Sequence, residues 1–221
     1  MRLKKLTQKL ETGAEIMEKN IEIILSAVFQ VLLFSLVPFI WWLITARKTV
    51  GFLNWVGLKK PKVENKKPFI IWVSCLVLMF VGMTFLPITI VDSSVTAANQ
   101  FKGFGLILLP AGFAWGIIAT GLGEEILFRG FLGKRSINKF GFNIGNTIQG
   151  IAFGLMHGVL FSLLADVSIG TVLIITITTG ALGWVMGLVN EKYANGSIIP
   201  SWLIHGVGNF AVSIFAMLDI I

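Results

Sequence analysis

The sequence predicts an all-α membrane protein, a polytopic bundle of about six transmembrane helices, and three observations lead to this fold class. Hydrophobic residues make up 55% of the 221 residues, and the mean hydropathy is +0.85. Charged residues make up 13%, whereas about 25% is usual in a soluble domain. Six apolar stretches approach or exceed the roughly 20 residues that cross a bilayer. We therefore expect residues 1–221 to form a single membrane-embedded domain.

The predicted elements follow in order along the chain. Residues 1–20 are polar and rich in lysine, which is typical of a polar N-terminal arm or an interfacial helix. Residues 46–68 form a basic connector whose apolar stretch Phe52–Leu58 contains a tryptophan, so we expect it in the headgroup region. We expect Asn143 or Asn146 to cap the fourth span. The six predicted spans are Ile21–Thr45, Phe69–Val91, Phe104–Leu132, Ile144–Leu164, Thr171–Val189 and Ile198–Ile221.

The formal charge is +7, and the basic residues favour the first, third and fifth loops. By the positive-inside rule these loops face the cytosol. The lysine-rich N-terminus then either crosses to the other side, or the first span is a re-entrant or in-plane element. A nucleic-acid-binding protein needs a basic patch on a soluble surface. The sequence has no such patch, so we expect no nucleic acid partner. The single cysteine, Cys75, excludes both a disulfide framework and a zinc site built from thiolates.

Glycines recur every four residues on two predicted helices and form two small-residue faces. The first series is Gly150, Gly154 and Gly158, and the second is Gly183 and Gly187. Small residues at this spacing let the backbones of neighbouring helices approach closely. We expect these faces to serve helix packing, and the first of them to fix the position of His157.

Three apolar helices carry ionisable or amide side chains. Such ionisable groups cost about 2.5–3.5 kcal/mol each on insertion scales, and they persist in membranes when they pair or have a function. The chain has two histidines, and both lie in apolar helices. The side chains concerned are Glu124, Glu125 and Arg129 in the third span, His157 in the fourth, and His205 and Asn209 in the sixth.

Helical spacing separates the roles of the two adjacent carboxylates. Glu125 precedes Arg129 by four residues, which places the two on one face in the favourable order. Glu125 is therefore the predicted structural carboxylate. Glu124 is rotated by about 100° from it and is free to meet another helix. The same four-residue spacing relates two further pairs, Phe153 with His157 and His205 with Asn209.

A carboxylate, two imidazoles and an amide in a partly dry site suit the hydrolysis of a peptide bond. This reaction needs a base that deprotonates water and donors that bind the developing oxyanion. Glu124 and His157 can hold and activate a water molecule. His205 and Asn209 can donate to the oxyanion, and one such donor is typically worth about 2.7–4 kcal/mol.

The patterns Glu-Glu-x-x-x-Arg, Phe-x-x-x-His and His-x-x-x-Asn, each in an apolar helix and in this order, resemble the CPBP family. That family comprises CAAX proteases and bacteriocin-processing or immunity proteins, including the type II CAAX prenyl proteases. The resemblance covers Gly121–Asn209 and makes residues 104–221 the predicted catalytic half. It implies that Glu124 and His157 activate water and that His205 and Asn209 form the oxyanion hole. It further implies that Glu125 and Arg129 support the site. The helical spacing of Phe153 and His157 indicates that the Phe153 ring supports the histidine.

The same resemblance implies a cavity that opens to one membrane face and laterally to lipid. The expected partners are a lipidated or membrane-inserted peptide substrate and the lipid bilayer itself. The short loops and small size of the chain indicate the cytoplasmic membrane of a bacterium as its location.

Two questions stay open on the sequence alone, the cofactor and the class of function. The motif His-Glu-x-x-His is absent, and the sequence favours a metal-free site, but Glu124, His157 and His205 would also make a His₂Glu zinc site. The alternative to a protease is a non-hydrolytic scaffold or bacteriocin immunity protein that binds a partner in the membrane. A transporter is disfavoured because the sequence has no internal repeat.

Overall fold

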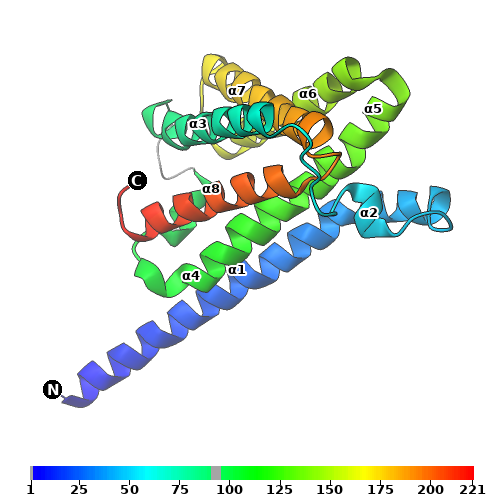
Figure 1. The fold of residues 1–221 in the computed structure, drawn as a ribbon. Coiled ribbons are helices and arrows are strands. Elements are labelled where there is room, and N and C mark those ends of the chain that lie inside the picture. Colours follow the sequence, from blue (N-terminus) through cyan, green and yellow to red (C-terminus); the bar gives the residue numbers. More distant parts are fainter. Residues whose placement is uncertain (1, 91–95) are drawn as a thin grey trace.

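The computed structural model describes residues 2–90 and 96–221, and the regular elements in these two ranges are helices (Figure 1). The α-helices are α1 Arg2–Thr45, α2 Phe52–Val56, α3 Lys66–Ile90, α4 Leu109–Phe113, α5 Lys134–Phe140, α6 Phe142–Leu164, α7 Ile169–Leu188 and α8 Ile199–Met217. Short 3₁₀ turns occur at Ala97–Phe101 and Gly105–Leu108. Three segments are π-helical, namely Ala114–Gly123, Glu125–Gly133 and Val189–Tyr193.

Six helical stretches are long and apolar enough to cross a membrane, which confirms the predicted fold class. They are Gly13–Thr45, Lys66–Leu86, Gly105–Phe140, Phe142–Leu164, Ile169–Tyr193 and Ile199–Met217. Val91, the last residue of the predicted second span, and Met1, the first of the predicted arm, lie outside the described residues. The protein is a multi-pass membrane protein.

Burial follows the pattern of a membrane protein. Large apolar side chains such as Ile44 and Leu163 are 79% and 76% exposed on the outside of the bundle. In contrast, the side chains of Glu125, Gln149 and Ser201 are buried inside it. The bundle interior thus holds the polar groups that would be costly in contact with lipid.

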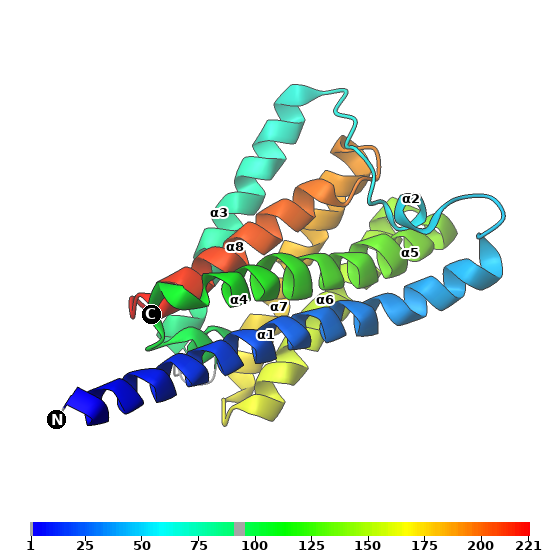
Figure 2. The same cartoon turned by 90° about the horizontal axis from the view of Figure 1, so that it is seen from below.

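The first helix extends beyond the predicted first span at its N-terminal end. α1 runs without interruption from Arg2 through Pro38 to Thr45, so residues 2–20 continue the first helix instead of forming a loose arm (Figure 2). Lysine, leucine and glutamate make up ten of these 19 residues, and all three are good helix formers. Their intrinsic helix propensity explains why the helix continues past the apolar span.

The third span is longer than predicted and has a different geometry. Helical structure extends over 36 residues from Gly105 to Phe140, and most of its middle is π-helical. In a π-helix each N–H bonds the carbonyl five residues earlier, and such turns are frequent at functional sites. The site residues of this span therefore stand on a wider helix than the α-helix that the spacing argument assumed.

Glycines bring α8 into backbone contact with this π-helical run. A Cβ atom on Gly116 would lie 2.5 Å from the Phe210 nitrogen, and one on Gly121 would lie 2.9 Å from the Gly206 Cα. Neither position accepts a larger residue without movement of α8. This close approach places His205, next to Gly206, against the segment that carries Glu124.

The packing of α6 on α7 confirms the role predicted for the glycine series. A Cβ atom on Gly150 would lie 3.0 Å from the Gly180 oxygen, and one on Gly154 would overlap the Thr176 oxygen. The predicted asparagine cap of the fourth span is wrong. α6 begins after Gly141 without a side-chain cap, and buried Asn146 instead donates its amide to the Trp184 oxygen at 2.9 Å. Asn146 fits there because Gly187 presents no side chain to it.

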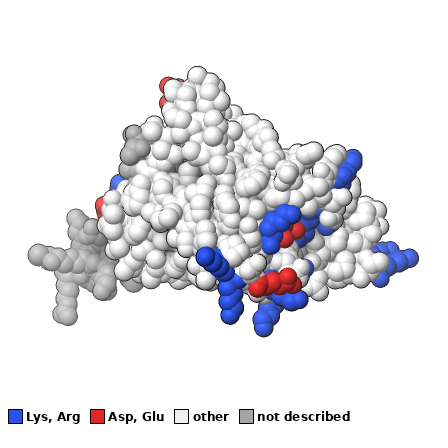
Figure 3. All heavy atoms as spheres, turned by 45° about the horizontal axis from the view of Figure 1, so that its top comes forward, with Lys and Arg blue, Asp and Glu red and all other residues white. Residues whose placement is uncertain are grey.

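The first, third and fifth loops meet at one end of the bundle. Ile198 donates its backbone N–H to the Gly57 oxygen at 2.9 Å, and Lys134 Nζ lies 2.6 Å from both Glu191 Oε1 and the Gly196 oxygen. Lys and Arg side chains gather toward the α2 and α5 end of the face in Figure 3. Both chain ends lie at the opposite end of the bundle (Figure 1). The assignment of the basic end to the cytosol stays a prediction.

Candidate active site

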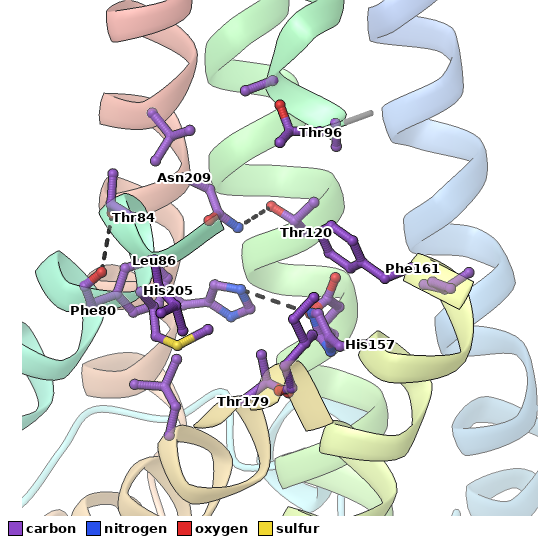
Figure 4. Close-up of a pocket in the computed structure, with 18 of the residues that line it drawn as sticks. Phe80, Thr84, Leu86, Thr96, Thr120, His157, Phe161, Thr179, His205 and Asn209 are labelled. Atoms are coloured by element: carbon purple, nitrogen blue, oxygen red, sulfur yellow. Dashed lines mark hydrogen bonds and ion pairs between the residues drawn. The ribbon is translucent and has the colours of Figure 1, made fainter. Parts of the chain in front are cut away.

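A cavity of about 380 Å³ lies between α3, the π-helical run, α6, α7 and α8 (Figure 4). Its lining is mostly apolar, with contributions such as Phe80, Leu160 and Leu182. A small set of polar groups is also in the lining, namely Thr84, Thr120, Glu124, His157, Thr179, His205 and Asn209, together with Gln30 and polar residues of the 96–99 segment. The combination of an apolar cavity with a few convergent polar groups is typical of a ligand-binding site.

Glu124 lies at the centre of the polar groups. Its Oε2 atom is 3.8 Å from His205 Nε2 and 4.0 Å from His157 Nε2. The residue is buried, and within the described part of the chain this oxygen has no hydrogen-bond partner. Two helices, α6 and α8, thus direct their ring nitrogens at one carboxylate oxygen of a third, and the separations leave space for a small polar group between them.

The hydrogen bonds on the far side of each ring determine which nitrogen faces Glu124 with a lone pair. His157 Nδ1 lies 2.9 Å from the Phe153 carbonyl oxygen, which only accepts, so Nδ1 carries the hydrogen. His205 Nδ1 lies 3.4 Å from Glu125 Oε1, an ionised acceptor. With the hydrogen on Nδ1, a neutral ring presents the lone pair of Nε2 to Glu124, whereas a ring that carries a second hydrogen presents an N–H there.

Glu125 has a different environment from its neighbour. Its carboxylate lies 3.3 Å from Arg129 Nη1, as the four-residue spacing predicts, and both side chains are buried. It also accepts a short hydrogen bond from Ser201 Oγ, and Ser201 in turn accepts from Asn190 Nδ2 at 2.6 Å. A chain of buried polar groups from two further elements thus holds the carboxylate that orients His205.

Phe153 links the ion pair to the second histidine. The Arg129 guanidinium lies 4.0 Å above the Phe153 ring, and the His157 ring lies 4.5 Å from it, centroid to centroid. Arg129 Nη2 also contacts the Met186 sulfur. The ring therefore occupies the space between Arg129 and His157, in agreement with the supporting position predicted for it.

Thr120 fixes the orientation of the Asn209 amide. Asn209 Nδ2 lies 2.8 Å from Thr120 Oγ1, and the Thr120 hydroxyl lies 3.0 Å from the Gly116 carbonyl oxygen (Figure 4). Because the single hydroxyl hydrogen is donated to the carbonyl, Thr120 Oγ1 can only accept from Asn209. The amide nitrogen must therefore face Thr120, and its second N–H is free to serve another acceptor.

The structure brings all seven predicted site residues into one connected group. Four of them line the cavity with Phe153, whereas Glu125 and Arg129 lie behind it. Sequence reasoning missed Thr120, Asn190 and Ser201. The four-residue helical spacing could have indicated two of these residues, because Ser201 precedes His205 by four residues and Thr120 precedes Glu124 by four. No such spacing indicated Asn190, since it reaches the site only through the packing of α7 and its π-helical extension against α8.

The fold and the site together define a multi-pass membrane protein with a buried carboxylate–histidine centre. The family model described as Type II CAAX prenyl endopeptidase Rce1-like matches residues 105–211, which contain every predicted site residue. Residues 105–211 are thus similar to the Rce1-like family, and this similarity supports a CAAX-type intramembrane protease with a membrane-associated protein substrate. The comparisons with curated proteins and with solved structures found no match.

Proposed function

We propose that this protein cleaves a peptide bond in a lipidated or membrane-inserted substrate, with Glu124 as the general base. The observation that carries the proposal is the position of Glu124 Oε2, buried without a hydrogen-bond partner among the described residues and faced by two Nε2 atoms. A water molecule at this point donates one hydrogen to Glu124 and the other to His157 Nε2. Glu124 takes the proton as the water oxygen attacks the carbonyl carbon.

The oxyanion that then forms is bound by Asn209 and His205. Asn209 contributes its second N–H, which Thr120 leaves free. His205 donates from Nε2 as the imidazolium, and Glu125 next to its Nδ1 is the counter-ion for that form. Glu124 finally passes its proton to the leaving nitrogen, which yields a carboxylate and a free amine. The mostly apolar cavity lining accommodates the lipid or apolar side chain of the substrate.

A metal-free mechanism agrees better with the distances than a zinc site does. Zinc ligands at about 2.0–2.1 Å in tetrahedral arrangement lie roughly 3.4 Å apart, whereas Glu124 lies 3.8 and 4.0 Å from the two histidines. Among the described residues no set of three His, Cys, Asp or Glu side chains is arranged to hold a metal ion. We expect chelators to leave turnover unchanged. Loss of turnover that zinc restores would instead assign Glu124, His157 and His205 as ligands.

The experiment that tests the proposal is the cleavage of a farnesylated CAAX peptide in proteoliposomes. Glu124→Gln should lower turnover about 10²–10⁴-fold, the usual contribution of a general base. Glu64→Gln is the matched control, since Glu64 is exposed in the connector and should leave turnover unchanged. Full cleavage by Glu124→Gln would refute the mechanism. A cellular phenotype that survives this substitution would favour the scaffold or immunity function.

A further inference from the structure

A second opening reaches Glu124 from the lipid side, between α1 and α6. This groove is lined by α1 residues around Phe29 and Leu33, by Glu124, and by Met156 and Leu160 of α6. Phe29 and Leu33 are 65% and 52% exposed, so one side of the groove opens directly to the surroundings of the bundle. Because Glu124 and Leu160 also line the main cavity, the groove and the cavity meet at the proposed general base.

Two polar side chains of α1 lie in this groove. Ser26 and Gln30 are four residues apart and share one helix face, in a stretch of otherwise apolar residues from Ile23 to Phe34. Gln30 lines the main cavity as well. Its amide has no hydrogen-bond partner among the residues that the structure describes, although the side chain is half-buried. Polar groups in a membrane helix are rare and mark sites that bind or pair.

The backbone around Gln30 is held next to the proposed general base. A Cβ atom on Gly123 would lie 3.6 Å from both the Val31 Cα and the Phe34 ring. Gly123 immediately precedes Glu124, so the absence of a side chain there lets α1 pack on this part of the π-helical run. This contact fixes Gln30 at a constant position relative to the Glu124 backbone.

We propose that the groove binds the main chain of the substrate peptide beside the scissile bond, and that Gln30, helped by Ser26, supplies its hydrogen bonds. The inference rests on the proposed function. An extended peptide at membrane depth exposes N–H and C=O groups that find no water there, and each unpaired group costs several kcal/mol. A glutamine amide offers one donor face and one acceptor, which matches both kinds of main-chain group. The apolar anchor then occupies the main cavity while the peptide leaves between α1 and α6.

The proposed role of the Gln30 amide in substrate binding can be tested by measuring KM and kcat of substituted proteins. Gln30→Met keeps the length of the side chain and removes both polar atoms, so we expect KM for a farnesylated CAAX peptide to rise about 3–10-fold, equivalent to one hydrogen bond, with kcat nearly unchanged. Ser26→Ala should raise KM less. Ser35→Ala is the matched control, because Ser35 also lies on α1 but outside the groove, and it should behave as wild type. Wild-type KM in Gln30→Met would overturn the inference.

Cross-linking tests the path independently of turnover. Benzoylphenylalanine at position 33, in a Glu124→Gln background, should capture a biotinylated farnesylated CAAX peptide. The same probe at position 32 should not, because Leu32 lies outside the groove although it is more exposed than Leu33, 64% against 52%. Equal capture from both positions would overturn the inference while leaving the general-base mechanism intact. Normal cleavage by Glu124→Gln would refute the mechanism instead.

Discussion

Ser201→Ala offers the sharpest test of how the buried network acts on the site. The substitution removes the hydroxyl that donates to Glu125 and accepts from Asn190 Nδ2. A hydrogen bond to a charged group is worth about 1.5–3 kcal/mol, so the free energy of unfolding should fall by about that amount. Arg129 still holds one side of the Glu125 carboxylate, which limits the displacement.

The effect on catalysis should appear in kcat and not in KM. Ser201 does not line the cavity, so substrate binding is unaffected, but Glu125 loses part of what positions it against His205 Nδ1. In metal sites, loss of a group that orients a ligating histidine lowers activity about 10- to 100-fold, and the same positioning argument applies to His205 here. We expect the lower end here, an approximately tenfold decrease in kcat, measured with the peptide assay on purified protein in proteoliposomes.

Ser213→Ala is the matched control for this experiment. Ser213 is as deeply buried as Ser201 and lies on the same helix, but its hydroxyl donates to the Phe210 oxygen one turn away and touches no site residue. It should leave kcat unchanged. If Ser201→Ala lost stability as expected and retained the kcat of the control, Ser201 would serve the fold alone and the reasoning would be refuted.

Two further substitutions test the π-helical run. Thr120→Val removes the acceptor that orients the Asn209 amide, so kcat should fall about tenfold or more because the oxyanion loses a well-placed donor. Thr120→Ser keeps the acceptor and should restore most of the lost kcat. Equal kcat in the two variants would contradict the orientation argument. Gly116→Ala places a methyl group 2.5 Å from the Phe210 nitrogen and should lower the Tm by several degrees, whereas Gly170→Ala, with only the Ser168 hydroxyl at 3.6 Å, should not. The measurement is the Tm of the wild type and of these two glycine variants, and an unchanged Tm in Gly116→Ala would contradict the close packing of α8 at this position.

The sequence predicted the parts of this molecule that depend on local periodicity. Long apolar stretches determine the six spans because a bilayer permits few alternatives for a backbone without water. The four-residue spacing of Glu125 and Arg129 predicted their ion pair, and that of Phe153 and His157 predicted their ring contact. Each of these contacts lies within a single helix, where the spacing in sequence alone determines which side chains are neighbours.

The features that the sequence did not predict arise between helices. The π-helical geometry around Glu124 accompanies the backbone contact of Gly116 and Gly121 with α8, a pairing that no periodicity reveals. Asn146 was predicted as a helix cap, but its buried side chain forms a hydrogen bond with the backbone of α7, in the space beside Gly187. In both cases a partner distant in sequence decides the local structure.

The two adjacent glutamates show how the fold assigns different tasks to the same side chain. Glu125 faces Arg129, Ser201 and His205, so its oxygens are occupied and its charge is balanced. Glu124 lines the cavity, where its Oε2 atom has no hydrogen-bond partner among the described residues. A carboxylate that is held by three partners and does not line the cavity can orient a neighbour but does not reach a water molecule in the cavity. A carboxylate with a free oxygen, at the point where the cavity and the α1–α6 groove meet, can accept the proton of such a water molecule.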